Sequence, residues 1–149
     1  MLILDKESTI MEIIKAAQLA HKEHWRRTSD ESAGDKQATS ATKSWQNKVI
    51  SQNVCCEVQI ADNLKERIDV IDLSECTAYE LKVSGKNPHH EFYKDIFKVI
   101  VYNQNHSNKI NQFVFLTEKE GADKLNKGMG KEVMQSIHAY DFSVKVIEI

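Results

Sequence analysis

Residues 67–82 (RIDVIDLSECTAYELK) constrain the fold of this chain more than any other stretch. Two runs in which apolar and polar residues alternate flank the polar pair Ser74 and Glu75, which predicts two short strands joined by a two-residue turn. Ile71 and Ala78 interrupt the polar face of these strands, and the opposite face is apolar. This pattern fits central strands that are buried on both sides better than it fits a half-exposed sheet.

The predicted turn sets the register of the two strands. Residues whose numbers sum to 149 pair across it, so Asp69 faces Glu80 and Arg67 faces Lys82. Because side chains alternate along a strand, these four residues project to the same side. The other side is expected to carry the core residues Ile68, Val70, Tyr79, Leu81 and Val83.

Two carboxylates directly opposite each other repel unless a positive charge lies between them. A divalent cation is the common remedy, and oxygen ligands suit Mg²⁺ or Mn²⁺, which keep several waters and complete their shell with a phosphate. Lys82 lies on the same face as Glu80. It could orient or deprotonate an attacking water, or neutralise charge that develops on a phosphate.

Asp69, ten intervening residues and then Glu80-Leu81-Lys82 resemble the signature of the PD-(D/E)XK nuclease superfamily, which includes many type II restriction endonucleases and Holliday-junction resolvases. The resemblance implies a magnesium-dependent endonuclease that hydrolyses phosphodiester bonds of DNA, of restriction or repair type. It implies that Asp69 and Glu80 bind the metal, that the backbone carbonyl of Leu81 is a further ligand, and that Lys82 is the catalytic lysine. Mn²⁺ is expected to substitute for Mg²⁺.

The resemblance also implies an α/β fold with a restriction-endonuclease-like core, a mixed central sheet of about five strands flanked by helices in the order α-α-β-β-β-α-β-α-β. From Trp45 onward, the hydrophobic pattern predicts this order. We expect one nuclease-like domain over residues 1–149, with an N-terminal helix and mobile loop over 1–42 and the core over 43–149. The expected helices are about 8–27, capped by Ser8 or Thr9, 41–52, 88–104 and 120–139, the last with a weak point at 128–130; the expected strands, besides the hairpin, are 54–60, 110–117 and 142–149.

The segment before the first strand departs from the superfamily pattern. A glutamate there often completes a metal site, but SWQNKVISQN contains no acid, and Gln46 or Asn47 stands near that position. The resemblance therefore leaves a second metal open. Glu57 is the nearest acid, and the register predicts it on the Val70 face, away from Asp69.

Basic and polar residues around the motif are candidates for nucleic-acid binding. A net charge of −2 and a pI near 6.3 lack the basic excess of many DNA-binding proteins, so binding would depend on a local patch. The alternative for Lys98 is a solvated helix face with an Asp95–Lys98 pair. The candidate residues are Arg67, Lys86, His90, Tyr93 and Lys98.

The remaining expectations concern surroundings and partners. Three cysteines without metal or disulfide spacing predict reduced thiols in a cytoplasmic protein, and no apolar run has the length of a membrane span.

The apolar stripe of the first helix is a possible contact surface for a homodimer, and an unknown partner could supply specificity. Two alternatives to the nuclease stay open: a nucleic-acid-binding or assembly protein of the same fold with a degenerate site, and a structural protein with an exposed charge ladder on one sheet face.

Overall fold

A computed structural model describes the backbone of residues 2–28, 35–84, 86–128 and 131–149, and the side-chain surroundings of 9–25, 40–84, 86–128 and 132–149. Within these residues, five strands form one mixed sheet in the order β1-β2-β3-β4-β5. The first three strands are antiparallel neighbours, and β3, β4 and β5 are parallel. The strands are β1 (Val54–Gln59), β2 (Arg67–Asp72), β3 (Thr77–Lys82), β4 (Gln112–Thr117) and β5 (Ser143–Glu148).

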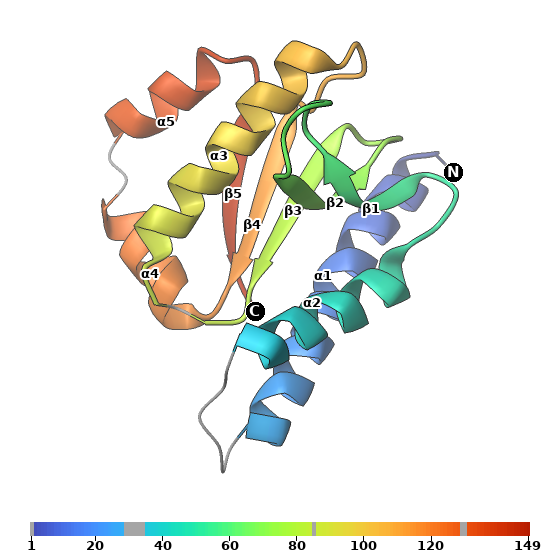
Figure 1. The fold of residues 1–149 in the computed structure, drawn as a ribbon, viewed down its shortest axis with the longest axis vertical. Helices are drawn as coiled ribbons and strands as arrows, with labels where there is room; N and C mark the ends of the chain where they lie inside the picture. The colour runs from blue at the N-terminus through green and yellow to red at the C-terminus, as the bar shows by residue number, and fades with distance from the viewer. Residues whose placement is uncertain (1, 29–34, 85, 129–130) are drawn as a thin grey trace.

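Helices cover both faces of the sheet (Figure 1). One layer consists of α1 (Leu2–Thr28) and α2 (Asp35–Val49), and the other of α3 (Pro88–Asn105), α4 (Lys119–Gly128) and α5 (Lys131–His138). This arrangement confirms an α/β protein with a mixed five-stranded sheet. None of the helices in the described ranges is long and apolar enough to cross a membrane.

The predicted order of elements is wrong near the C-terminus. We expected one helix over 120–139, but α4 ends at Gly128 and α5 begins at Lys131, so the order is α-α-β-β-β-α-β-α-α-β. Glycine disfavours a helix interior, which explains why α4 ends at Gly128. Residues 129 and 130 of the predicted weak point lie outside the described residues.

The N-terminal expectations also need correction. Ser8 and Thr9 do not cap α1, because the helix already begins at Leu2. Part of the expected loop is helical, since α2 begins at Asp35, and residues 29–34 of that loop lie outside the described residues. The predicted dimer stripe of α1 lies largely in the core of its own chain, where Ile13 and Ala17 are buried against the sheet.

The hairpin register is confirmed. Val70 pairs with Tyr79, and Ile71 pairs with Ala78, as the sum of 149 requires. The connection is longer than predicted, with four residues between the last pair, Asp72 and Thr77. Buried Asp72 stabilises it, because its Oδ1 accepts hydrogen bonds from the backbone N–H groups of residues 74 and 75 and from the hydroxyl of residue 74.

Two hydrophobic clusters lie on the two faces of the sheet. Val70, Tyr79, Leu81 and Val83 share one face, as predicted, and this face packs on α1 and α2. Ile68 does not lie on this face, because it packs with Ile71 in the cluster on the α3 side. The regular alternation of side chains therefore fails between these residues, at Asp69, where the strand departs from ideal pairing.

Candidate active site

The two acids of the motif lie where β2 and β3 stop pairing through their backbones. The last backbone pair toward this end is Val70 with Tyr79. Beyond it, the backbone N–H of Asp69 donates to Oε1 of Glu80 (3.3 Å), and the N–H of Leu81 donates to Oδ2 of Asp69 (3.1 Å). The two carboxylates therefore accept the hydrogen bonds that backbone carbonyl groups would accept in a regular pair of strands. These bonds hold both acids at the end of the hairpin where the two strands separate.

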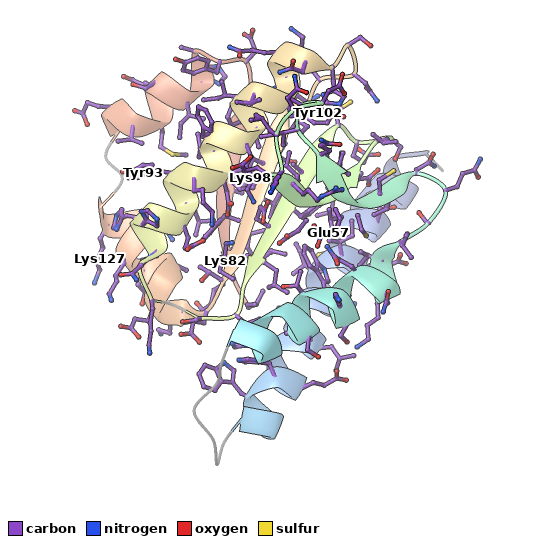
Figure 2. All side chains as sticks on the ribbon, viewed as in Figure 1. Glu57, Lys82, Tyr93, Lys98, Tyr102 and Lys127 are labelled. Carbon is purple, nitrogen blue, oxygen red and sulfur yellow. The ribbon has the colours of Figure 1, made fainter. Side chains whose placement is uncertain are left out.

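Two lysines and two further acids surround this pair. Lys98 Nζ lies 3.1 Å from Oε1 of Glu80 and 3.2 Å from Oδ1 of Asp95. Lys82 Nζ lies 3.2 Å from Oε2 of Glu91 and 3.6 Å from Oδ2 of Asp95. Figure 2 shows Lys82 and Lys98 between α3 and the sheet. Asp95 therefore joins the two lysines, and Lys98 joins Asp95 to Glu80.

Burial has the largest effect on the pKa of Glu80. Glu80 is 1 % exposed, and burial raises its pKa well above the ordinary value; Asp69 and Asp95 raise it further, whereas Lys98 lowers it. Oε2 of Glu80 has no hydrogen-bond partner among the described residues. A proton shared with Asp69, or a cation, is what such an oxygen requires.

The charge on Lys82 is held firmly. Burial lowers the pKa of its ammonium group, but the nearby carboxylates of Asp95, Glu80, Asp69 and Glu91 outweigh burial and raise the pKa above the ordinary value. Lys82 therefore stays protonated at neutral pH. A protonated lysine can neutralise developing negative charge, but it cannot accept a proton from water.

A cleft of about 430 Å³ opens at this end of the hairpin. It lies at the carboxyl ends of the parallel strands β3 and β4, a common position for ligand sites in α/β sheets. Its walls come from α2, the segment that follows β3, and the first turn of α3. The lining residues are Thr42, Lys43, Glu57, Asp69, Leu81, Lys82, Val83, Ser84, Lys86, Pro88, Glu91, Phe115 and Thr117.

The prediction that Glu57 lies away from Asp69 is wrong. Glu57 lines the same cleft as Asp69 and lies near α2 in Figure 2. Its φ of 51° is left-handed, which is uncommon for a residue other than glycine and turns the strand locally. Buried Gln46 joins the two acids, because its Nε2 donates to Oε1 of Glu57 (3.3 Å) and to the backbone oxygen of Asp69 (2.9 Å).

The predicted nucleic-acid-binding residues do not form one surface. Lys86 lines the cleft, whereas Lys98 is buried and contacts Glu80. The expected Asp95–Lys98 pair is present, but the helix face that carries it is buried and not solvated. Arg67 is exposed and donates to the backbone oxygen of Glu57 (3.1 Å). Tyr93 lines a separate groove between α3 and α5, at the outer edge in Figure 2, and His90 is exposed on α3.

Two carboxylates and one backbone carbonyl are the donors that could hold a divalent cation here. Asp69 and Glu80 are adjacent, Glu80 has an oxygen without a donor, and the carbonyl of Leu81 belongs to the same strand. Mg²⁺ often takes one or two carboxylates and completes its shell with water and phosphate. The described residues contain no group of three or more His, Cys, Asp or Glu side chains that could hold a metal, so a cation at Asp69 and Glu80 would depend on water and phosphate for most of its ligands.

The sequence motif indicated part of this site. Asp95 was missed as a member, although its spacing from Glu91 and Lys98 places all three on one helix face. The bridging role of Gln46 had no signal in the sequence, because it depends on contacts between α2 and two strands.

Comparison with family models, curated proteins and solved structures found no match to this chain. The resemblance to the PD-(D/E)XK superfamily therefore rests on the sequence motif alone.

Proposed function

We propose that this protein is a metal-dependent nuclease that hydrolyses phosphodiester bonds in DNA, with a restriction-endonuclease-like core. The observation that carries the proposal is the register of the β2–β3 hairpin, which brings Asp69 beside Glu80 at the splayed end of two strands. Lys82 follows on β3 and lines the same cleft as Asp69. Buried acids beside a cleft are costly to maintain, and a functional role is a common reason for them.

Asp69, Glu80 and the backbone carbonyl of Leu81 would hold Mg²⁺ or Mn²⁺. When bound, such a cation polarises a phosphoryl oxygen and lowers the pKa of a bound water. Lys82 faces the cleft with a charge that Asp95 and Glu91 hold in place. Its role is to stabilise negative charge on the phosphate, because a lysine with a raised pKa is a poor base for the water.

The test is cleavage of supercoiled, linear and branched DNA in Mg²⁺, Mn²⁺ or chelator. Lys82→Met removes the ammonium group and keeps most of the alkyl chain, and Lys127→Ala removes an exposed lysine at the far end of α4 (Figure 2). We expect metal-dependent cutting that Lys82→Met loses and Lys127→Ala retains. Absence of cutting with every cation and substrate would refute the proposal.

A second candidate is a nucleic-acid-binding or assembly protein with a degenerate site. It is favoured by the 3.1 Å contact of Lys98 with Glu80, because the ammonium group of Lys98 already compensates the charge of this acid. It is also favoured by Gln46, which stands on α2 where an acid would strengthen a metal site. Isothermal titration calorimetry with Mn²⁺ separates the two: the nuclease binds the cation through Asp69 and Glu80, and the degenerate protein does not. An exposed charge ladder is excluded, because Glu80 is 1 % exposed.

A further inference from the structure

Of the two acids of the motif, Asp69 lines the cleft, and buried Glu80 lies directly behind it. Asp69 is half-buried and Glu80 is 1 % exposed, so a phosphate must enter the cleft to approach them. The volume of about 430 Å³ lies toward the lower end of the range of about 300–1,000 Å³ for pockets that hold small ligands. A ligand that reaches these acids must therefore be narrow.

Two exposed lysines line this cleft from different elements. Lys43 comes from α2, and Lys86 comes from the segment between β3 and α3. Both side chains are exposed, and neither forms an ion pair with any described residue. Lys82, in contrast, already contacts Glu91 and Asp95. The cleft thus offers two exposed positive charges around a set of acids that a phosphate would otherwise avoid.

A DNA duplex is stiff, with a persistence length of about 50 nm, so it cannot bend sharply into a cleft of this size. A single strand is flexible, and proteins that bind single strands use positive grooves that follow the backbone. Leu81, Val83 and Pro88 add apolar lining on which a sugar or base can pack.

We propose that the cleft binds single-stranded nucleic acid, with Lys43 and Lys86 contacting the phosphates that flank the one nearest Asp69 and Glu80. This inference rests on the proposed function, since it names the form of the substrate that the acids would act on. It assigns a role to Lys43 and Thr42 of α2, which form the wall opposite the motif. One copy of the chain is then sufficient, because only one strand enters each cleft.

The experiment measures binding of a labelled single-stranded oligonucleotide and of its duplex by fluorescence anisotropy, in Ca²⁺ and in chelator, over a series of salt concentrations. The variants are Lys43→Ala/Lys86→Ala and the control Lys127→Ala/Lys145→Ala, which removes two exposed lysines outside the cleft. Cleavage of both substrates in Mg²⁺ is measured in parallel with the wild type.

We expect the wild type to prefer the single strand at least tenfold. Loss of two phosphate contacts should reduce the slope of log K against log salt by about 1.4 and weaken binding about 25-fold at 0.1 M salt, with no such change in the control. Equal or tighter binding of the duplex, or equal effects of the two double variants, would overturn the inference. Single-strand binding through Lys43 and Lys86 without any cleavage would refute the nuclease and leave the binding site standing, whereas cleavage with a duplex preference would do the reverse.

Discussion

Lys98 offers the sharpest test of the buried charge network. Lys98→Met removes the ammonium group, keeps most of the length of the side chain, and leaves Glu80 and Asp95 in place. The side chain of Lys98 is 10 % exposed, and its Nζ lies 3.1 Å from Glu80 and 3.2 Å from Asp95. At an effective dielectric constant of about 20, each such pair contributes about 5 kcal/mol of Coulomb attraction, most of which offsets the cost of burying the charges.

Removal of one partner from a buried ion pair costs about 3–5 kcal/mol, because the remaining charge stays buried without compensation. We therefore expect the free energy of unfolding of Lys98→Met to fall by about that amount. For a chain of this length, the unfolding midpoint falls by about 2–4 °C for each kcal/mol. Urea unfolding, followed by circular dichroism, measures the change directly. The double variant Glu80→Gln/Lys98→Met should recover about 2 kcal/mol, because it leaves no uncompensated charge at position 80.

The sign of the pH dependence follows from the raised pKa of Glu80. Because the pKa of Glu80 is raised, the folded state keeps a proton that the unfolded chain releases. The free energy of unfolding therefore falls as pH rises, by at most about 1.4 kcal/mol per pH unit for one proton. Lys98 lowers the pKa of Glu80, so its removal raises that pKa further. The deficit of Lys98→Met relative to wild type should therefore grow from pH 5 to pH 8. A deficit below about 1 kcal/mol, or one that is constant over this range, would refute the network.

Three other substitutions probe the surroundings of the site. Thr117→Val should raise the free energy of unfolding by about 1–3 kcal/mol in thermal unfolding, since the buried hydroxyl of Thr117 has no partner among the described residues; a loss of stability would show that the hydroxyl is satisfied. Asp72→Ala should cost about 2–4 kcal/mol in urea unfolding, because the hairpin connection loses three hydrogen bonds, and an unchanged midpoint would contradict its role. Gln46→Glu should lower the unfolding midpoint in chelator, where it removes the donor to Asp69 and adds a like charge; Mn²⁺ should restore the midpoint, and failure to do so would count against a cation at Asp69.

The sequence predicted the hairpin and its register because alternation and the turn residues are local properties. The four-residue connection left the register unchanged, since Asp72 and Thr77 still pair with the same sum as the two-residue turn predicted. The placement of Ile68 and Glu57 could not be predicted in this way. It depends on the left-handed backbone at Glu57 and on the contact with α2, which join parts of the chain that are distant in sequence.

The acids and lysines of the site illustrate the same limit. The spacing of Asp95 and Lys98 predicted their ion pair correctly, but the same spacing suits an exposed helix surface. Burial is what converts this pair into part of the site, and burial follows from the packing of α3 on the sheet. The chemistry of Lys82 was likewise open until its partners were known, because both roles considered for it require only a lysine near a phosphate.

The contact between Lys98 and Glu80 bears on both candidate functions, the nuclease and the degenerate binding protein. Its ammonium group and a divalent cation both compensate Glu80, so a cation that binds the carboxylate at Oε1 must displace Lys98, whereas one that binds at Oε2 need not. The nuclease requires that Glu80 accept a cation beside Asp69 in one of these two ways. In the degenerate protein, Lys98 would be the permanent counter-ion, and Lys98→Met would then gain the ability to bind Mn²⁺ that the wild type lacks. Titration of both proteins with Mn²⁺ therefore separates the two functions without any substrate. Binding by the wild type supports the nuclease, and binding by Lys98→Met alone supports the degenerate protein.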